Sequence, residues 1–320
     1  MTSLFIPSPP VGVWYLGPIP IRAYALSIIT GIILGWWITG RRWRARGGTQ
    51  ETLDGILIWA VLAGIVGARI YHVITDNELY FGPGRTWYRM FYIWEGGLGI
   101  WGAVAGGALA AWWGCRRAKV SFSSLADVVA PGLLVAQAAG RIGNYFNQEL
   151  YGGPTTLPWG LEIDPAHRMI GYEQYATYQP TFLYELLWCL LGAGVLVLVE
   201  RRLRLGRGKL FAAYIVWYTL GRFWVEGLRI DPANRFDGFR LNSYTSLIVF
   251  VAGVILLVAL LITRPGLSPV PIEPTGEQVI ADDDADASPD GAALQEPADS
   301  PEAPANAEAT TNQGPEDLTS

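Results

Sequence analysis

The chain has 320 residues, of which 51% are hydrophobic and only 16% are charged, and it contains 14 tryptophans and 15 tyrosines. This balance is typical of a protein whose solvent is a lipid bilayer, and it argues against a soluble globular domain. The net charge of −5 conceals two different parts. Residues 265–320 hold 13 acidic residues and no lysine or arginine, which leaves residues 1–264 with 15 acids, 23 bases and a net charge of +8. A basic body between long apolar segments suits anionic membrane lipid and argues against a nucleic-acid partner.

Seven apolar segments of about 17–22 residues follow one another along the chain, each long enough for a hydrocarbon core of about 30 Å. They lie near residues 21–40, 54–75, 97–114, 121–140, 181–199, 210–228 and 243–263. We therefore predict an all-α polytopic membrane protein with seven transmembrane helices. Residues 1–264 would form the transmembrane domain, and residues 265–320 an acidic, Pro/Ala-rich disordered tail.

Basic residues are concentrated in alternate loops. The first segment is followed by four arginines, Arg41, Arg42, Arg44 and Arg46, and the loops near 116–119 and 201–209 are equally basic. Because basic loops stay in the cytoplasm, we expect the N-terminus and residues 145–180 outside and the acidic tail inside. The stretch 145–179 is too long for a simple connector, so we predict that it forms a small extracytoplasmic cap.

Residues 140–152 form a dense polar stretch where the fourth segment meets this long loop, and they read GRIGNYFNQELYG. Arg141 cannot lose its charge, so it is costly near a bilayer unless an anion meets it, and Asn144 adds donors for phosphate or ester oxygens. A lone arginine here could simply reach the interface. Three glycines in the stretch, however, let backbone approach a ligand closely. The stretch therefore predicts a lipid headgroup site.

The sixth segment carries four polar residues on one helical face: Tyr218, Arg222, Glu226 and Arg229. Three further polar residues reach the same level from other segments: Tyr24, Arg69 and Arg141. Arg222 and Glu226 could pair simply to lock the bundle. The four arginines outnumber the nearby carboxylates Glu149 and Glu226, however, so we predict a bound anion, most simply a phospholipid phosphate.

The spacing of the cysteines and histidines matches no metal-binding or redox motif. Cys115 and Cys189 lie far apart in or beside apolar segments, and His72 and His167 are equally separate. We therefore expect neither a disulfide nor a metal site.

The stretch 140–152 resembles the signature of the prolipoprotein diacylglyceryl transferases of bacterial cytoplasmic membranes, Gly-Arg-x-Gly/Ala-Asn-Phe-x-Asn-x-Glu-x-x-Gly, with Tyr145 in place of the Phe. The resemblance extends over roughly residues 12–262. Similar enzymes use residue types that this chain matches at Tyr24, Arg141, Asn144, Glu149, Gly152, Tyr218, Arg222, Glu226 and Arg229.

The resemblance implies transfer of the diacylglyceryl group of phosphatidylglycerol to the lipobox cysteine of prolipoprotein signal peptides, without a cofactor and with release of glycerol 1-phosphate. The enzyme would be a multi-pass protein of the bacterial cytoplasmic membrane, acting in the first step of lipoprotein maturation. We expect Arg141 and Arg222 to bind the phosphate, supported by Arg229 and Arg69. Asn144 and Gly152 would contact the lipid, and Tyr24 and Tyr218 would orient it. Glu149 or Glu226 would accept the thiol proton or position an arginine.

One position departs from the family pattern. Many members have a histidine in a Gly-Gly-x-x-x-His-Gly-Gly motif, where this chain has Trp101, so the identity of the general base stays open. Two other classes of protein would also contain such an arginine-rich site: a transporter or flippase for anionic lipid, and an inactive lipid-binding scaffold. The apolar inner halves of the segments, such as 31–39 and 190–199, disfavour a polar path across the membrane.

Overall fold

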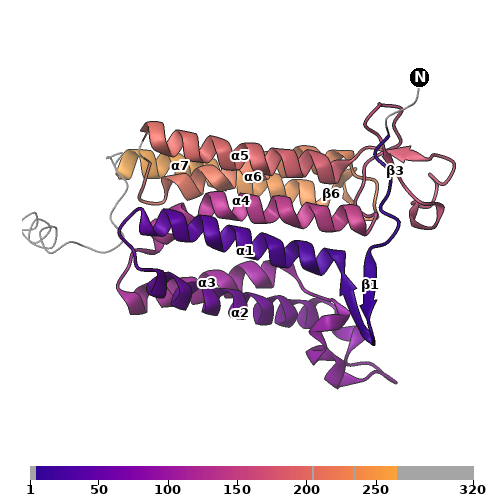
Figure 1. Ribbon diagram of the computed structural model, residues 1–320, viewed down its shortest axis with the longest axis horizontal. Helices are drawn as coiled ribbons and strands as arrows, with labels where there is room; N and C mark the ends of the chain where they lie inside the picture. Colours follow the sequence, from indigo (N-terminus) through magenta and orange to yellow (C-terminus); the bar gives the residue numbers. More distant parts are fainter. Residues whose placement is uncertain (1–4, 204, 234, 265–320) are drawn as a thin grey trace, which may run out of the picture. The chain divides into compact units, whose positions relative to one another are not determined.

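The computed structural model describes residues 5–203, 205–233 and 235–264, and seven long α-helices make up most of this part. Figure 1 shows them in order: α1 (Ala23–Arg44), α2 (Gln50–Thr75), α3 (Ile100–Ala118), α4 (Phe122–Phe146), α5 (Thr181–Leu203), α6 (Lys209–Leu228) and α7 (Leu241–Thr263). The predicted disordered tail, residues 265–320, lies outside the described residues.

Short antiparallel strand pairs and 3₁₀ turns join the helices at the end of the bundle where α1 begins. The strand pairs are β1 (Val13–Leu16) with β2 (Ile19–Arg22), β3 (Leu161–Glu162) with β4 (Thr177–Tyr178), and β5 (Arg235–Phe236) with β6 (Phe239–Arg240). The 3₁₀ turns are Asn77–Leu79, Trp87–Phe91, Ile93–Glu95 and Pro165–His167. The segment between α4 and α5 has a small core of its own, formed by Tyr151, Leu161, Ile163 and Tyr178.

Each predicted segment overlaps one of the seven helices, so the chain is a mostly helical membrane protein. Five helices, α1, α2, α4, α5 and α7, are long and apolar enough to cross a membrane by length and composition. Helices α3 and α6 are not among them. Glycines and two terminal arginines lower the hydropathy of α3, and α6 carries Lys209, Arg222 and Glu226. Seven membrane spans therefore stay a prediction.

Helix α4 packs on α1, α5 and α6, and it contains a proline. Pro131 has no N–H to donate to the carbonyl of Asp127 one turn earlier. Arg42 of α1 supplies the missing donor: its Nη2 lies 3.2 Å from the Asp127 carbonyl and its Nε 2.9 Å from that of Val128. Arg42 also pairs with Glu200 of α5 at 2.6 Å. One arginine thus ties three helices together where the proline would otherwise leave a buried carbonyl unpaired.

A second polar contact of α4 caps the start of α6. The fully buried Asp127 side chain accepts hydrogen bonds from the backbone N–H groups of Gly208 at 2.8 Å and Phe211 at 2.9 Å. These N–H groups have no partner within the helix, so a carboxylate from the neighbouring helix acts as the N-cap.

We expect Asp127→Ala to lower the free energy of unfolding by about 2 kcal/mol or more, because it leaves buried N–H groups without an acceptor. Asp127→Asn keeps one acceptor oxygen, so its free energy of unfolding should fall by less. Thermal unfolding of the purified protein in detergent measures both variants. Glu78→Ala, in an exposed turn, is the control, and equal melting temperatures for all three variants would contradict the capping role.

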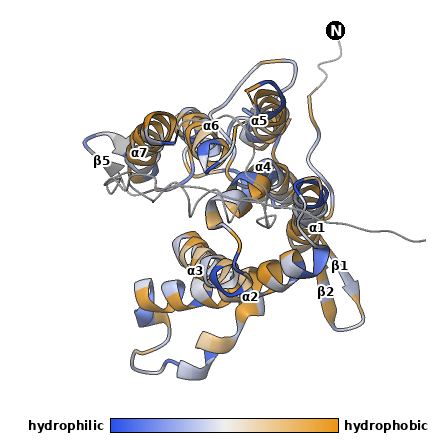
Figure 2. Ribbon diagram, turned by 90° about the vertical axis from the view of Figure 1, so that its left-hand side faces the viewer, coloured by the Kyte–Doolittle hydropathy of each residue, from blue (hydrophilic) through white to orange (hydrophobic). Residues whose placement is uncertain are grey.

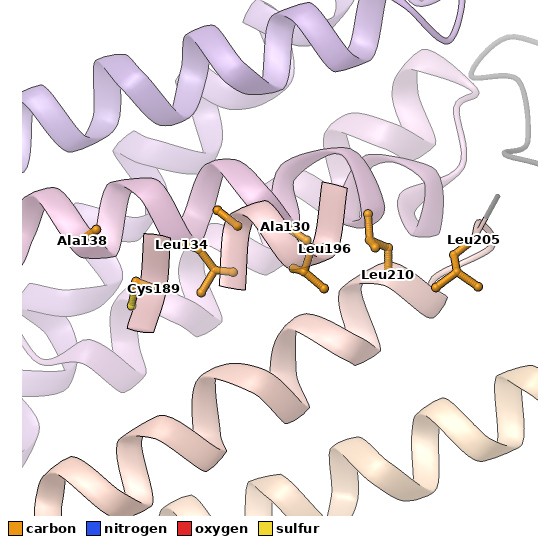
Figure 3. Packing of buried hydrophobic residues seen from close by; sticks show 8 residues of the cluster. Ala130, Leu134, Ala138, Cys189, Leu196, Leu205 and Leu210 are labelled. Atoms are coloured by element: carbon orange, nitrogen blue, oxygen red, sulfur yellow. The ribbon is translucent and has the colours of Figure 1, made fainter. Parts of the chain in front are cut away.

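Helices α5 and α6 are joined by a reciprocal tryptophan contact. The indole N–H of Trp188 donates to the carbonyl of Trp217 at 3.0 Å, that of Trp217 donates to the carbonyl of Trp188 at 3.1 Å, and the two rings stack 4.6 Å apart. Each ring covers a glycine of the other helix: a Cβ on Gly192 or Gly221 would lie 2.2 or 2.1 Å from the indole nitrogen. The contact therefore fixes how the two helices are rotated against each other. Figure 3 shows the apolar packing of α4, α5 and α6 beside it.

Helices α2 and α3 pack tightly on each other and touch the remaining helices much less. Glycines allow this closeness. A Cβ on Gly67 would lie 2.4 Å from the Gly102 carbonyl, and a Cβ on Gly106 would lie 2.4 Å from the Ala63 carbonyl. Figure 2 shows the pair side by side, apart from α5, α6 and α7. A buried cluster that includes Trp43, Leu53 and Val128 connects the pair to α1 and α4.

Candidate functional site

The arginines of α4 and α6 meet at a carboxylate that the sequence analysis did not single out. Glu185 of α5 is buried, with Oε1 2.7 Å from Arg141 Nη2 and Oε2 3.4 Å from Arg222 Nη1. The Tyr218 side chain lies beside the Arg141 guanidinium. A signal for Glu185 was present, because it is a single acidic residue in an otherwise apolar segment, and such residues are usually functional.

Glu226 is the centre of a second group of ion pairs. Its carboxylate is fully buried and lies 2.5 Å from Arg222 Nη2, 3.3 Å from Arg229 Nη1 and 2.6 Å from Arg240 Nε. Asn242 donates a further hydrogen bond at 3.2 Å. The Arg222–Glu226 pair is therefore present, but it belongs to a larger network.

Asp231 closes this network in the loop after α6. It pairs with Arg229 at 2.7 Å and with Arg240 at 2.8 Å. Burial acts to raise the pKa of the Asp231 carboxyl, but hydrogen bonds and positive charge from Arg229 and then Arg240 outweigh it, so the pKa is lowered. Asp231 thus stays ionised at neutral pH and holds both arginines.

The ion pairs form one continuous chain of four arginines and three carboxylates: Arg141, Glu185, Arg222, Glu226, Arg229, Asp231 and Arg240. The sequence suggested four arginines and only two carboxylates at this level, and the structure reduces that excess to one positive charge. Asp231 lies in the loop after α6 and Arg240 in β6, where no helical periodicity could have connected them to the site.

The polar stretch after Arg141 folds back on itself at the end of α4. Arg141 Nη1 donates to Asn144 Oδ1 at 3.0 Å, and Asn144 Nδ2 donates to Glu149 Oε1 at 2.8 Å. Gln148 and Leu150 have φ angles of 51° and 60°, in the left-handed region that non-glycine residues rarely adopt. Hydrogen bonds hold this turn, since Gln148 bonds with Ser8 and Asp164 through its side chain and the Leu150 carbonyl accepts from Thr181.

Two glycines of this stretch serve close packing. A Cβ on Gly143 would lie 2.7 Å from the ring of Tyr24, so the glycine lets α1 bring Tyr24 against the stretch. Gly152 lies between the ends of α5 and α6: its N–H donates to the Gln179 carbonyl at 2.9 Å, and a Cβ would lie 2.9 Å from the Leu228 carbonyl. The structure therefore gives Gly152 a backbone role at this junction.

A small cavity of about 10 Å³ lies inside this arrangement. Charged and polar residues from three parts of the chain line it, together with Leu150 and Phe182: Arg141, Asn144, Thr181, Glu185 and Arg229. Three predicted site residues thus meet at one cavity, joined by Glu185, which supplies a carboxylate to the lining.

Arg69 is not part of this network. Its guanidinium donates to the backbone carbonyls of Arg89, Met90, Gly96 and Gly97 at 2.6–3.0 Å and lies over the Tyr80 ring. Its role in the structure is to hold the segment between α2 and α3. The level of Arg69 along its helix was predictable, but the packing of α2 on α3 decides where its side chain goes.

Trp101 and the two histidines lie away from this cavity. Trp101 is half exposed in the first turn of α3. His72 Nδ1 lies 3.0 Å from the Asp76 carboxylate, and the backbone carbonyl of His167 accepts a hydrogen bond from Tyr151. Neither histidine lines the cavity. The described residues contain no group of three His, Cys, Asp or Glu side chains that could hold a metal ion.

Together these features define a helical membrane protein with a buried arginine and carboxylate site, suited to binding an anion. A family model described as "Prolipoprotein diacylglyceryl transferase" matches residues 11–259. The chain belongs to the prolipoprotein diacylglyceryl transferase family.

Relatives of high identity carry a matching name. A phosphatidylglycerol–prolipoprotein diacylglyceryl transferase of Cutibacterium acnes is 57% identical over 260 residues, which cover 81% of this chain and 88% of the relative. Proteins of the same name include one from Frankia alni, 56% identical over 84% of this chain and 70% of its own length. A third relative, phosphatidylglycerol–prolipoprotein diacylglyceryl transferase 2 of Streptomyces coelicolor, is 53% identical over 84% of this chain and 85% of its own length.

Proposed function

We propose that this protein transfers the diacylglyceryl group of phosphatidylglycerol to the cysteine thiol of prolipoproteins that carry a lipobox, and releases glycerol 1-phosphate. The observation that carries the proposal is the cavity lined by Arg141, Asn144, Glu185 and Arg229, because it offers fixed positive charge beside amide donors. The relatives' shared name supports the same chemistry.

The reaction makes two demands on the site. The sulfur of a thiolate attacks the terminal glyceryl carbon of the diacylglyceryl group, and the bond between this carbon and the phosphate oxygen breaks. Both the thiolate and the leaving phosphate are negative, so fixed guanidinium groups favour the thiolate and stabilise the charge that grows on the leaving group. Arg141 suits the phosphate, since its Nε is buried without a hydrogen-bond partner among the described residues.

The thiol proton needs an acceptor, and the environments of the two predicted carboxylates differ. Glu226 is bound by three arginines and Asn242, so both of its carboxylate oxygens already have partners. Glu149 accepts hydrogen bonds only from the neutral amides of Asn144 and Asn147 among the described residues. We therefore propose Glu149 as the proton acceptor and Glu226 as the residue that positions Arg222 and Arg229.

We place the site at the outer face of the bacterial cytoplasmic membrane, in a domain of seven spans formed by residues 1–264. The cavity lies at the end of the bundle opposite the arginine-rich ends of α1, α3 and α5, which suits a cytoplasmic basic end. A cysteine introduced at the exposed Arg207 should resist an impermeant thiol reagent added to whole cells. Rapid labelling there would reverse the orientation.

The activity is tested by incubating the purified protein with phosphatidylglycerol labelled in its acyl chains and a lipobox peptide. We expect a peptide heavier by one diacylglyceryl group, with an equal amount of glycerol 1-phosphate. Tight binding of the lipid without any change in peptide mass would instead indicate a scaffold. Lipid moved between leaflets without product would indicate a flippase.

The double variant His72→Asn, His167→Asn should keep transfer within about tenfold of the parent, which corresponds to about 1.4 kcal/mol. The reason is that neither imidazole lines the cavity, and that the His72 imidazole lies 3.0 Å from the Asp76 carboxylate. The same peptide assay measures the rate. A folded double variant that binds phosphatidylglycerol but forms no product would show that a histidine is the base.

A further inference from the structure

The basic end of the bundle carries three arginines that each cover a tryptophan one turn earlier in the same helix. The pairs are Trp37 with Arg41, Trp112 with Arg116 and Trp113 with Arg117, with 5.1, 5.4 and 5.5 Å between guanidinium carbon and ring centroid. All three tryptophans are about half exposed. Such pairs place a cation at the edge of an apolar surface. Figure 2 looks onto this end and shows hydrophilic residues at the near ends of α1 and α5.

Two grooves of similar composition flank the first turns of α2 at this end. The groove between α1 and α2 has a volume of about 490 Å³, and its walls include Ile32, Trp36 and Trp37 together with Arg44. The groove between α2 and α3 has a volume of about 540 Å³, and its walls include Trp59 and Trp113 together with Arg117. Each is thus an apolar channel with a guanidinium at one end.

The wall of the first groove includes a glycine, Gly40, which faces the Gln50 side chain. A Cβ on Gly40 would lie 3.0 Å from Gln50 Oε1, so a larger side chain at this position would fill the space. Its polar end is held in place by Asp54, which accepts hydrogen bonds from Trp36 Nε1 and Gln50 Nε2, both at 2.7 Å. The shape therefore does not depend on a bound molecule.

The charge at both grooves is positive. Arg41, Arg44, Arg116 and Arg117 enter no ion pair among the described residues, in contrast to Arg42 and Arg46, which pair with Glu200. Arg44 lines the first groove, and with Arg41 one turn earlier it outweighs Asp54 by one positive charge. In the lining of the second groove Arg117 is balanced by Glu51, and Arg116, the preceding residue, adds one positive charge nearby.

We propose that each groove binds one anionic phospholipid, with its phosphate at the exposed arginines and an acyl chain along the tryptophan walls. The apolar channel with a cationic end has the shape and polarity of such a lipid, and the surplus charge matches its phosphate. These sites are separate from the cavity at Arg141, because α1 carries the chain about 30 Å from Tyr24 to Arg44 at 1.5 Å per residue. The lipid here is a bound component and is not consumed.

Native mass spectrometry of the full-length protein tests this, with dioleoyl phosphatidylserine and dioleoyl phosphatidylcholine as probes. We expect the parent to retain two more molecules of the anionic lipid than of the zwitterionic one. Arg41→Gln with Arg44→Gln should lose one of these two, with affinity at that site about thirtyfold lower. The matched control is Arg201→Gln with Arg202→Gln, which removes the same charge from exposed positions at the same end of α5 and should bind like the parent.

Gly40→Leu provides a second variant that keeps every charge but fills the first groove, and it too should lose one anionic lipid. Equal retention of both lipids by the parent would overturn the proposal. So would an equal loss in the Arg201 and Arg202 control, because the effect would then come from net charge alone. Normal binding by the Arg41 and Arg44 variant together with normal binding by Gly40→Leu would also refute it.

Discussion

Replacing Arg141 or Arg222 by lysine should slow diacylglyceryl transfer about 10²–10³-fold although the positive charge is kept, which corresponds to about 3–4 kcal/mol of transition-state stabilisation. Each arginine uses its planar group at more than one place: Arg141 binds both Asn144 and Glu185, and Arg222 binds both Glu185 and Glu226. A lysine ammonium is a point charge on a flexible stem and cannot span two partners in this way.

The turnover of the purified variants with a lipobox peptide measures this loss. Arg89→Lys is the matched control, because Arg89 forms an exposed ion pair with Glu95 away from the cavity and should keep the parent rate. Near-normal rates for both Arg141→Lys and Arg222→Lys would mean that the site requires positive charge without a defined geometry.

Glu185→Gln should lower turnover by about 10²-fold or more, because Glu185 joins Arg141 of α4 to Arg222 of α6. A neutral amide leaves two guanidinium groups close together without the charge that holds them, in a buried site where a missing partner is costly. Glu185→Asp keeps the charge but shortens the side chain, so it should recover part of the rate. The turnover number, more than the KM for phosphatidylglycerol, should change, since the arginines remain present but misplaced.

Glu200→Gln is the control for this experiment. Glu200 is also poorly exposed and binds two arginines, Arg42 and Arg46, but at the opposite end of the bundle. We expect it to affect thermal stability more than turnover. A Glu185→Gln variant with the parent's turnover number would show that the bridge does not position the arginines.

The sequence predicted the helices well, because each apolar run of membrane length leaves the chain few alternatives. It also predicted the polar stretch, whose partners Arg141, Asn144 and Glu149 lie within nine residues of one another and meet through local bonds. Local density of unusual residues is a signal that sequence alone carries.

Contacts between distant segments were harder to predict. Glu185 meets Arg141 only because α5 presents this face to α4, and Arg69 leaves the site because α2 packs on α3. The 1.5 Å rise per residue gives the depth of a side chain, but its direction depends on helix packing. Arg240 reaches Glu226 from the short strand β6, where neither depth nor direction follows from helical periodicity.

The paired tryptophans of α5 and α6 have a consequence for how this sequence can change. Trp188 and Gly221 fit one another, as do Trp217 and Gly192, so four positions behave as two complementary pairs. A methyl group added to either glycine displaces an indole, and the displaced helix carries Glu185 or Arg222 with it. Substitutions at these positions should therefore be strongly non-additive in a double-mutant cycle. Divergence here would require both members of a pair to be exchanged together.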